Sequence, residues 1–120
     1  MRNREEAQLS AALLEYLEAA KPRCVYCAVP NGSRRGIVEA ANLKRQGMIA
    51  GAADWVFTWD NGSGWIELKT KKGTLNPSQS AFLLSCRRLG VHYEVARSLD
   101  ECIRILKCWG LVPKYADLQA

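Results

Sequence analysis

Hydrophobic and polar positions follow two different periods along this chain, and each period predicts one type of element. Leu9, Leu13 and Leu17 recur at helical spacing in an alanine-rich segment, and Pro22 ends it. Short runs of β-branched and aromatic residues, typical of strands, follow further along. In chain order the pattern predicts a helix at 4–20, a strand at 24–29, a helix at 36–46, strands at 54–59 and 64–70, a helix at 77–89, a strand at 91–97 and a helix at 99–109.

The order helix, strand, helix, strand, strand, helix, strand, helix predicts an α/β fold. Such an order covers both faces of a sheet, so we expect a mixed sheet of about four strands flanked by helices, an α/β/α arrangement. No repeat, linker or low-complexity segment interrupts the chain, and its 120 residues predict a single domain over residues 1–120.

Turn and capping residues mark several element boundaries. Pro30 opens a turn that runs to residue 33, and Pro77 follows Asn76 where a helix begins. Ser98 and Glu101, three residues apart, form the pattern of a capping box at the start of the last helix.

Residues 60–63, between the two central strands, predict a hairpin. Asn61-Gly62 tolerates the positive φ angles of a type I′ turn, and counting outward from it sets Asp54 opposite Lys69, with Glu67 as a diagonal neighbour of Asp54. Side chains alternate along a strand, so the hairpin has two different faces. The apolar face carries Trp55, Phe57, Trp59, Ile66 and Leu68, and the other carries Asp54, Val56, Thr58, Trp65, Glu67 and Lys69.

Two carboxylates and one amine thus converge near one end of these strands. Carboxylates a few ångströms apart repel, so one takes up a proton unless a cation lies between them. Mg²⁺ prefers oxygen ligands and keeps several waters, one of which can attack a phosphodiester. Asp54 followed by Glu67-x-Lys69 therefore fits a minimal phosphodiesterase site. The alternative is a solvated strand face with a routine cross-strand ion pair, which contributes little to stability.

Residues around this hairpin favour a nuclease. Gly51-Ala52-Ala53-Asp54 with Ile66-Glu67-Leu68-Lys69-Thr70 resembles the D…E-x-K signature of the PD-(D/E)XK nuclease superfamily. A larger ordered set resembles the VRR-NUC (virus-type replication-repair nuclease) family over roughly residues 5–105. The segments that carry this second resemblance are Asn31-Gly32-Ser33-Arg34, Ala41-Asn42-Leu43-Lys44, Gly47, the step from Gly51 to Asp54, Lys69-Thr70, Gly73-Thr74-Leu75-Asn76 and Gln79.

The resemblance implies a restriction-endonuclease-like fold with a metal-dependent nuclease site. By position in the motif, Asp54 and Glu67 would hold Mg²⁺ or Mn²⁺, and the backbone carbonyl of Leu68 would be a further ligand. Lys69 would serve the attacking water. Hydrolysis in this superfamily leaves a 5′-phosphate and a 3′-hydroxyl.

A glutamate of the first helix and a later glutamine complete the site that the resemblance implies. Glu6 precedes Gln8 as in the family's E-x-Q and would reach the metal through water, with Glu5 as the alternative. Gln79 opens the third predicted helix at the position of the family glutamine, although a solvated polar residue is also common there. Ala53 stands where the family usually has proline, which changes stiffness but removes no ligand.

The net charge of the chain predicts the class of molecule that it binds. Lys and Arg number 17 against 12 Asp and Glu, which gives a formal charge of +5 and an isoelectric point near 9.1. A small basic domain points to a polyanion, most often nucleic acid. Arg34 and Arg35 would contact DNA phosphates, or be solvated turn residues. The full set of candidate phosphate contacts, in loops or at helix ends near the predicted site, is Arg34, Arg35, Lys44, Arg45, Lys71 and Lys72.

The amino-acid composition and the cysteine spacing argue against several other classes of protein. With 48% apolar and 24% charged residues the chain is not of the disordered type, and it has neither a membrane-length apolar run nor a signal-peptide pattern, so we expect a cytoplasmic protein. Cys24-x-x-Cys27 lacks a second ligand pair, so buried free thiols are preferred over zinc for the five cysteines. Trp65 is expected to pack under a helix rather than stack on a base, and Trp109 to lie in the core or an interface.

These observations together predict a stand-alone, Mg²⁺- or Mn²⁺-dependent deoxyribonuclease. The resemblance further implies action in replication, recombination or repair in a bacterial or phage-infected cell, on branched DNA such as a Holliday junction. Two strands to cut suggest two sites, and hence a homodimer. No membrane and no organic cofactor are expected. The alternatives are a catalytically silent nucleic-acid-binding module and a scaffolding protein of nuclease ancestry.

Overall fold

The element order predicted from the sequence is confirmed by a computed structural model that describes residues 4–30 and 37–113. Boundaries differ by a few residues; the strand predicted at 64–70, for example, is Gly62–Leu68. The turn predicted at 30–33 lies outside the described residues beyond its first position. The elements are α1 (Arg4–Ala20), β1 (Val25–Ala28), α2 (Ile37–Arg45), β2 (Trp55–Trp59), β3 (Gly62–Leu68), α3 (Pro77–Arg88), β4 (His92–Ala96) and α4 (Leu99–Cys108).

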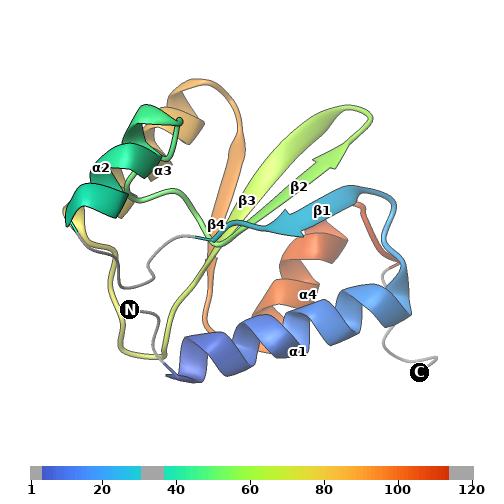
Figure 1. Ribbon diagram of the computed structural model, residues 1–120. Coiled ribbons are helices and arrows are strands. Elements are labelled where there is room, and N and C mark those ends of the chain that lie inside the picture. The colour runs from blue at the N-terminus through green and yellow to red at the C-terminus, as the bar shows by residue number, and fades with distance from the viewer. Residues whose placement is uncertain (1–3, 31–36, 114–120) are drawn as a thin grey trace.

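The four strands form one mixed sheet in the order β1-β2-β3-β4. β1 pairs with β2 and β2 with β3 in antiparallel fashion, whereas β3 and β4 are parallel because α3 crosses between them. In Figure 1, α1 and α4 lie on one side of the sheet, and α2 and α3 lie together on the other side. The predicted α/β/α arrangement with a four-stranded mixed sheet is therefore confirmed.

The larger core lies between the sheet and the pair α1 and α4. The face predicted to be apolar supplies its sheet side, with Phe57, Ile66 and Leu68 fully buried. The indole nitrogen of Trp55 donates a hydrogen bond to Ser10 Oγ at 3.0 Å and so links β2 to α1. Buried residues from the helices complete this core: Leu13, Leu17, Cys102, Ile105 and Leu106.

A smaller cluster lies between the sheet and α3. Ala53, Cys86 and Tyr93 are its buried members. Trp65 packs edge-on against Phe82 of α3, with ring centroids 5.0 Å apart, so the packing interpretation of this tryptophan is confirmed. This second side of the sheet is the one on which the predicted polar face lies.

The turn of the central hairpin lies one residue earlier than predicted. Trp59 pairs with Gly62, so Asp60 and Asn61 form the turn, and neither has a positive φ angle. The predicted Asn-Gly turn is wrong because Gly62 is a strand residue beneath the Trp59 indole, where a Cβ would lie 3.3 Å from the ring. Packing of the tryptophan on glycine therefore overrides the local turn preference.

This earlier turn changes the predicted strand pairing by two residues. Trp55 pairs with Ile66, and the same register continued by one residue sets Asp54 opposite Glu67 rather than opposite Lys69. The predicted Asp54–Lys69 pairing is thus wrong. A shift of two residues keeps every side chain on its face, because side chains alternate with a period of two. The assignment of residues to the two faces therefore survives.

Trp109 packs on the core as expected, whereas the cysteines differ in burial. Trp109 is half-buried and packs against the larger core, where it covers Gly64 so closely that a Cβ there would come within 2.6 Å of the indole. All five cysteines are free thiols, but the expectation that they are buried is only partly right, since Cys27 and Cys108 are exposed. No helix within the described residues is long and apolar enough to cross a membrane.

Candidate active site

Two carboxylates are buried where β2 begins and β3 ends. Asp54 is 5% exposed and Glu67 is 3% exposed. The backbone N–H of Leu68 donates to Asp54 Oδ2 at 2.8 Å, which fixes this carboxylate against the end of β3. Burial of two acids side by side is costly unless each carboxylate is compensated, so their partners decide what the site can do.

The two oxygens of Glu67 have different surroundings. Oε2 accepts a hydrogen bond from Gln79 Nε2 at 3.1 Å and lies 3.7 Å from Lys69 Nζ. Oε1 is buried and has no hydrogen-bond partner among the described residues. The structure therefore brings four of the predicted site residues together: Asp54, Glu67, Lys69 and Gln79.

Gln79 is placed by the cap of α3. Its side-chain oxygen accepts from the backbone N–H of Asn76, while Asn76 Oδ1 accepts from the backbone N–H of Gln79. This reciprocal cap leaves the amide NH₂ of Gln79 free to turn toward Glu67. The pattern Asn76-x-x-Gln79 is a capping box readable in the sequence, and it would have given Gln79 a positional role that residue chemistry alone did not.

Burial and neighbouring charges act strongly on Glu67. Burial, followed by the negative charge of Asp54, raises the pKa of Glu67 from 4.5 to about 8, while Lys69 opposes this rise. Glu6 and the proximity of the Asp54 carboxyl raise this pKa further. Without a cation the site therefore holds one acid in its protonated form near neutral pH.

The first helix contributes a third acid at greater distance. Glu6 is half-buried, and its charge raises the pKa of Glu67, whereas Glu5 is exposed. Of these two candidates, Glu6 is the one whose charge reaches the acid pair. Within the described residues, however, no three His, Cys, Asp or Glu side chains come close enough together to form a metal-binding group by themselves.

Two backbone contacts hold the segments that flank the acids. Gly51, with φ of +86°, approaches α3 so closely that a Cβ would lie 2.3 Å from the carbonyl oxygen of Ser78. Arg97, which the sequence did not single out, donates from Nη1 to the carbonyl oxygens of Thr70 and Gly73 at 2.8 and 2.6 Å. These contacts fix the chain before Asp54 and the loop after β3.

The candidate phosphate contacts fall in two described places. Lys71 and Lys72 are exposed in the loop that Arg97 holds, two and three residues after Lys69. Lys44 and Arg45 are exposed at the end of α2. The other two candidates, Arg34 and Arg35, lie outside the described residues.

The residues present fit a divalent cation. Lys69 lies beside one of the two buried carboxylates, and one of their oxygens, Glu67 Oε1, has no described partner. Oxygen donors of this kind suit Mg²⁺ or Mn²⁺, which complete their coordination with backbone oxygens and water. The predicted set of Asp54, Glu67, the Leu68 carbonyl and, through water, Glu6 is consistent with this donor chemistry.

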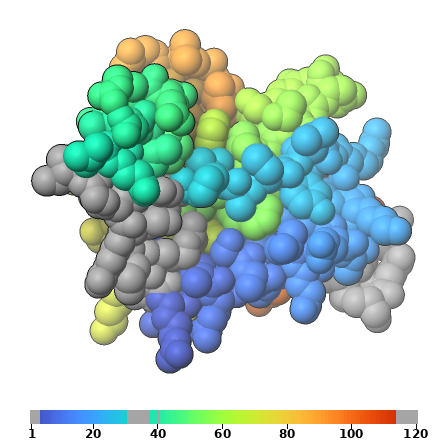
Figure 2. All heavy atoms as spheres, viewed as in Figure 1, coloured from blue at the N-terminus to red at the C-terminus, as the bar shows by residue number. Residues whose placement is uncertain are grey.

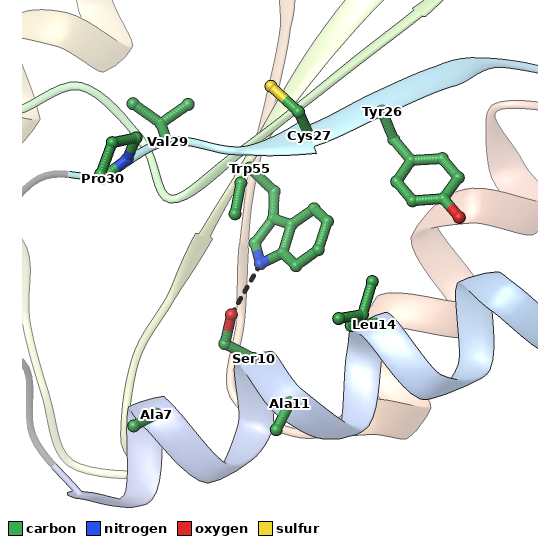
Figure 3. Close-up of a pocket in the computed structure, with 10 residues that line it drawn as sticks. Ala7, Ser10, Ala11, Leu14, Tyr26, Cys27, Val29, Pro30 and Trp55 are labelled. Carbon is green, nitrogen blue, oxygen red and sulfur yellow. Dashed lines mark hydrogen bonds between the residues drawn. The ribbon is translucent and has the colours of Figure 1, made fainter.

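An apolar groove lies on the opposite side of the sheet from the acids. It has a volume of about 650 Å³ and runs between α1 and β1, which lie side by side on the face shown in Figure 2. Figure 3 shows Trp55 pointing into it toward Ser10, with Leu14 and Tyr26 beyond. Trp55 and Asp54 are consecutive, so their side chains leave opposite faces. None of the predicted site residues that the structure describes lines this groove.

Comparisons with known proteins agree with this fold. No curated protein matches the chain. One solved structure, named "VRR_NUC domain protein", is similar with a TM-score of 0.71 at 19% identity, covering 91% of this chain and 90% of that one. Another, named "VRR_NUC domain", has a TM-score of 0.60 at 16% identity, covering 86% and 95%. The family model of the VRR-NUC domain matches residues 4–100, and the chain therefore belongs to this family of nuclease-type domains.

Proposed function

We propose that this protein is a Mg²⁺- or Mn²⁺-dependent deoxyribonuclease that hydrolyses phosphodiester bonds and acts as one nuclease domain over residues 1–120. One observation carries the proposal. Asp54 and Glu67 are buried together beside Lys69 and Gln79, and one glutamate oxygen lacks a described partner. A binding module for DNA phosphates has no use for a buried acid pair, because carboxylates repel phosphate.

In this proposal Asp54, Glu67 and the Leu68 carbonyl would hold the cation, and Glu6 would act on it through water. A divalent cation in such a site supplies a Lewis acid that activates water and neutralises charge on the phosphate. Lys69 orients the attacking water, and Gln79 holds the glutamate carboxylate in place through its hydrogen bond. Water attacks the phosphorus, the bond to the 3′-oxygen breaks, and the products are a 5′-phosphate and a 3′-hydroxyl.

DNA would be held by the basic residues around the acids. Lys71 and Lys72 lie two and three residues after Lys69, in a loop fixed by Arg97, so their positions relative to the acids are constrained. Lys44 and Arg45 would extend the contact along the duplex, together with Arg34 and Arg35. Contacts of this kind bind phosphates without reading bases, so recognition of DNA shape is expected rather than recognition of sequence.

The proposed substrate is branched DNA, cut by a homodimer in replication, recombination or repair. Two copies related by a two-fold axis would present two sites to the two strands of a junction. We place this activity in the cytoplasm of a bacterial or phage-infected cell.

A panel of linear, flapped, forked and four-way DNA tests the proposal, with each substrate incubated with Mg²⁺, Mn²⁺ or EDTA. We expect cleavage with either metal, none with EDTA, and a preference for branched substrates. Glu67→Gln and Lys69→Ala should each lower the cleavage rate by orders of magnitude while the variants still fold and bind DNA.

The matched control is Glu94→Gln, which alters an exposed glutamate of β4. Cleavage by both site variants at the parental rate would show that the active site lies elsewhere. DNA binding that ignores EDTA, with no cleavage in Mn²⁺, would instead identify a silent binding module. A monomer that cuts linear duplex as well as junctions would contradict the substrate and the dimer but not the nuclease.

A further inference from the structure

A tyrosine hydroxyl is buried without a described partner on the same side of the sheet as the acids. Tyr93 is 2% exposed, and its hydroxyl oxygen finds no hydrogen-bond partner among the described residues. Glu67 Oε1 has the same property. The Tyr93 hydroxyl can donate a hydrogen bond, and the Glu67 carboxylate oxygen can accept one. Native proteins leave few buried polar groups unpaired, so two on the same side of one sheet need an explanation.

The strand register brings the two side chains to one face. In the parallel pair of β3 and β4, Tyr93 lies beside Trp65 and Val95 lies beside Glu67. Residues two apart on a strand point the same way, so Tyr93 and Glu67 both project from the side covered by α3. The Tyr93 ring packs near Phe82 of that helix, with centroids 6.1 Å apart. Packing therefore fixes the ring and with it the hydroxyl oxygen, and only the direction of the O–H bond can change.

The charges of the acid pair act on the Tyr93 phenol. Burial raises the pKa of Tyr93, and after burial the charges of Glu67 and then Asp54 raise it further. The hydroxyl thus remains a proton donor in this place, and the nearby acceptors are carboxylates.

We propose that Tyr93 is a positioning residue whose hydroxyl donates a hydrogen bond to Glu67 Oε1 when this carboxylate holds the cation. The inference rests on the proposed metal site and adds a residue to it. A carboxylate oxygen has two lone pairs, so Oε1 can accept from Tyr93 and still bind a cation. Gln79 and Lys69 already hold Oε2. With the third contact the carboxylate cannot rotate away from its binding geometry.

The test compares Tyr93→Phe with Tyr26→Phe, using Mn²⁺ alone as the probe. Each variant removes one hydroxyl oxygen and keeps the ring. Tyr26 pairs with Phe57 and packs on the opposite side of the sheet, so it serves as the control. Binding of Mn²⁺ to the full chain is measured by calorimetry, and unfolding is measured with EDTA and with Mn²⁺.

We expect Tyr93→Phe to weaken Mn²⁺ binding about tenfold, as is typical when a residue that orients a metal ligand is lost. In EDTA the same variant should be as stable as the parent or more stable, because it removes a buried unpaired hydroxyl. Tyr26→Phe should leave the Mn²⁺ affinity unchanged. A role limited to packing predicts equal losses of stability with and without the metal, and that result would overturn the inference.

A second measurement uses the unaltered protein and does not depend on any variant folding. Addition of Mg²⁺ should shift a tyrosine band in the near-ultraviolet difference spectrum, because the phenol gains a charged acceptor. No tyrosine signal on saturation would overturn the inference. If the parent binds Mn²⁺ and Tyr93→Phe binds it equally well, the inference fails while the metal site stands. If the parent binds no Mn²⁺, both fail.

Discussion

Replacement of Glu67 by glutamine is expected to stabilise the metal-free protein near neutral pH. The carboxyl has a pKa of about 8 in the folded protein, against 4.5 as its ordinary value. Between these two values the unfolded chain releases a proton that the folded protein keeps. The stability contributed by this group is therefore complete below about pH 4.5 and is lost as the pH rises toward 8.

The expected size follows from the same two values. At about pH 7 the carboxyl is about 2.5 pH units above its ordinary pKa, which at about 1.4 kcal/mol per unit costs the folded state about 3 kcal/mol. Glutamine resembles the protonated acid, since its oxygen can accept from Gln79 and its NH₂ can face Asp54. We therefore expect a gain of about 2–3 kcal/mol near pH 7 that falls below about 1 kcal/mol near pH 5.

Urea unfolding in EDTA across pH 5 to 8 measures this difference. Glu94→Gln, on the exposed side of β4, should follow the parent at every pH. Addition of Mg²⁺ should stabilise the parent and leave Glu67→Gln nearly unchanged, because the variant lacks a ligand. Two results would refute the argument that burial of the Glu67 carboxylate destabilises the folded protein. One is a Glu67→Gln variant no more stable than the parent near pH 7, and the other is a gain in stability that does not change with pH.

Two further predictions concern the segments around the acids. The double variant Lys71→Ala/Lys72→Ala should reduce the slope of log K against log[salt] for duplex DNA by about 1.8, whereas Arg104→Ala on α4 should not; an unchanged slope would remove this loop from the DNA contact. Gly51→Ala should lower both stability and cleavage, because its Cβ would lie 2.3 Å from the Ser78 carbonyl oxygen beside Gln79. Gly47→Ala has a positive φ but open space and is the matched control, so equal losses in the two glycine variants would contradict the close-contact argument.

The two faces of the central hairpin could be predicted from the sequence, but its register could not. Alternation assigns Phe57 and Ile66 to one face and Glu67 to the other whichever residues form the turn, provided the error is an even number of positions. The register depends instead on which side chains pack against the two glycines of β3. Trp59 covers Gly62 and Trp109 covers the next glycine, and these are tertiary contacts that no local turn preference contains.

Some contacts of the two acids could likewise be predicted from the sequence, and others could not. Lys69 lies two residues from Glu67 on one strand, so its place on the same face follows from the period alone. Gln79 reaches Glu67 only because α3 packs across the sheet, although its cap with Asn76 was visible in the sequence. Tyr93 belongs to β4, whose neighbouring strand and direction are set by the crossover through α3. Its position on the same side of the sheet as the acids could therefore not be predicted from the sequence.

The site works against the stability of the fold that carries it, and this conflict is itself an argument for a cation. Asp54 and Glu67 are both nearly inaccessible, one glutamate oxygen has no described partner, and Lys69 supplies one positive charge for two acids. A structural ion pair would be more stable if apolar residues of similar size replaced it. The surrounding chain nevertheless holds the acids rigidly, through the Leu68 N–H, the cap of α3 and the Arg97 contacts. Rigid support for an unfavourable charge arrangement is what a site needs when binding of a cation resolves the conflict.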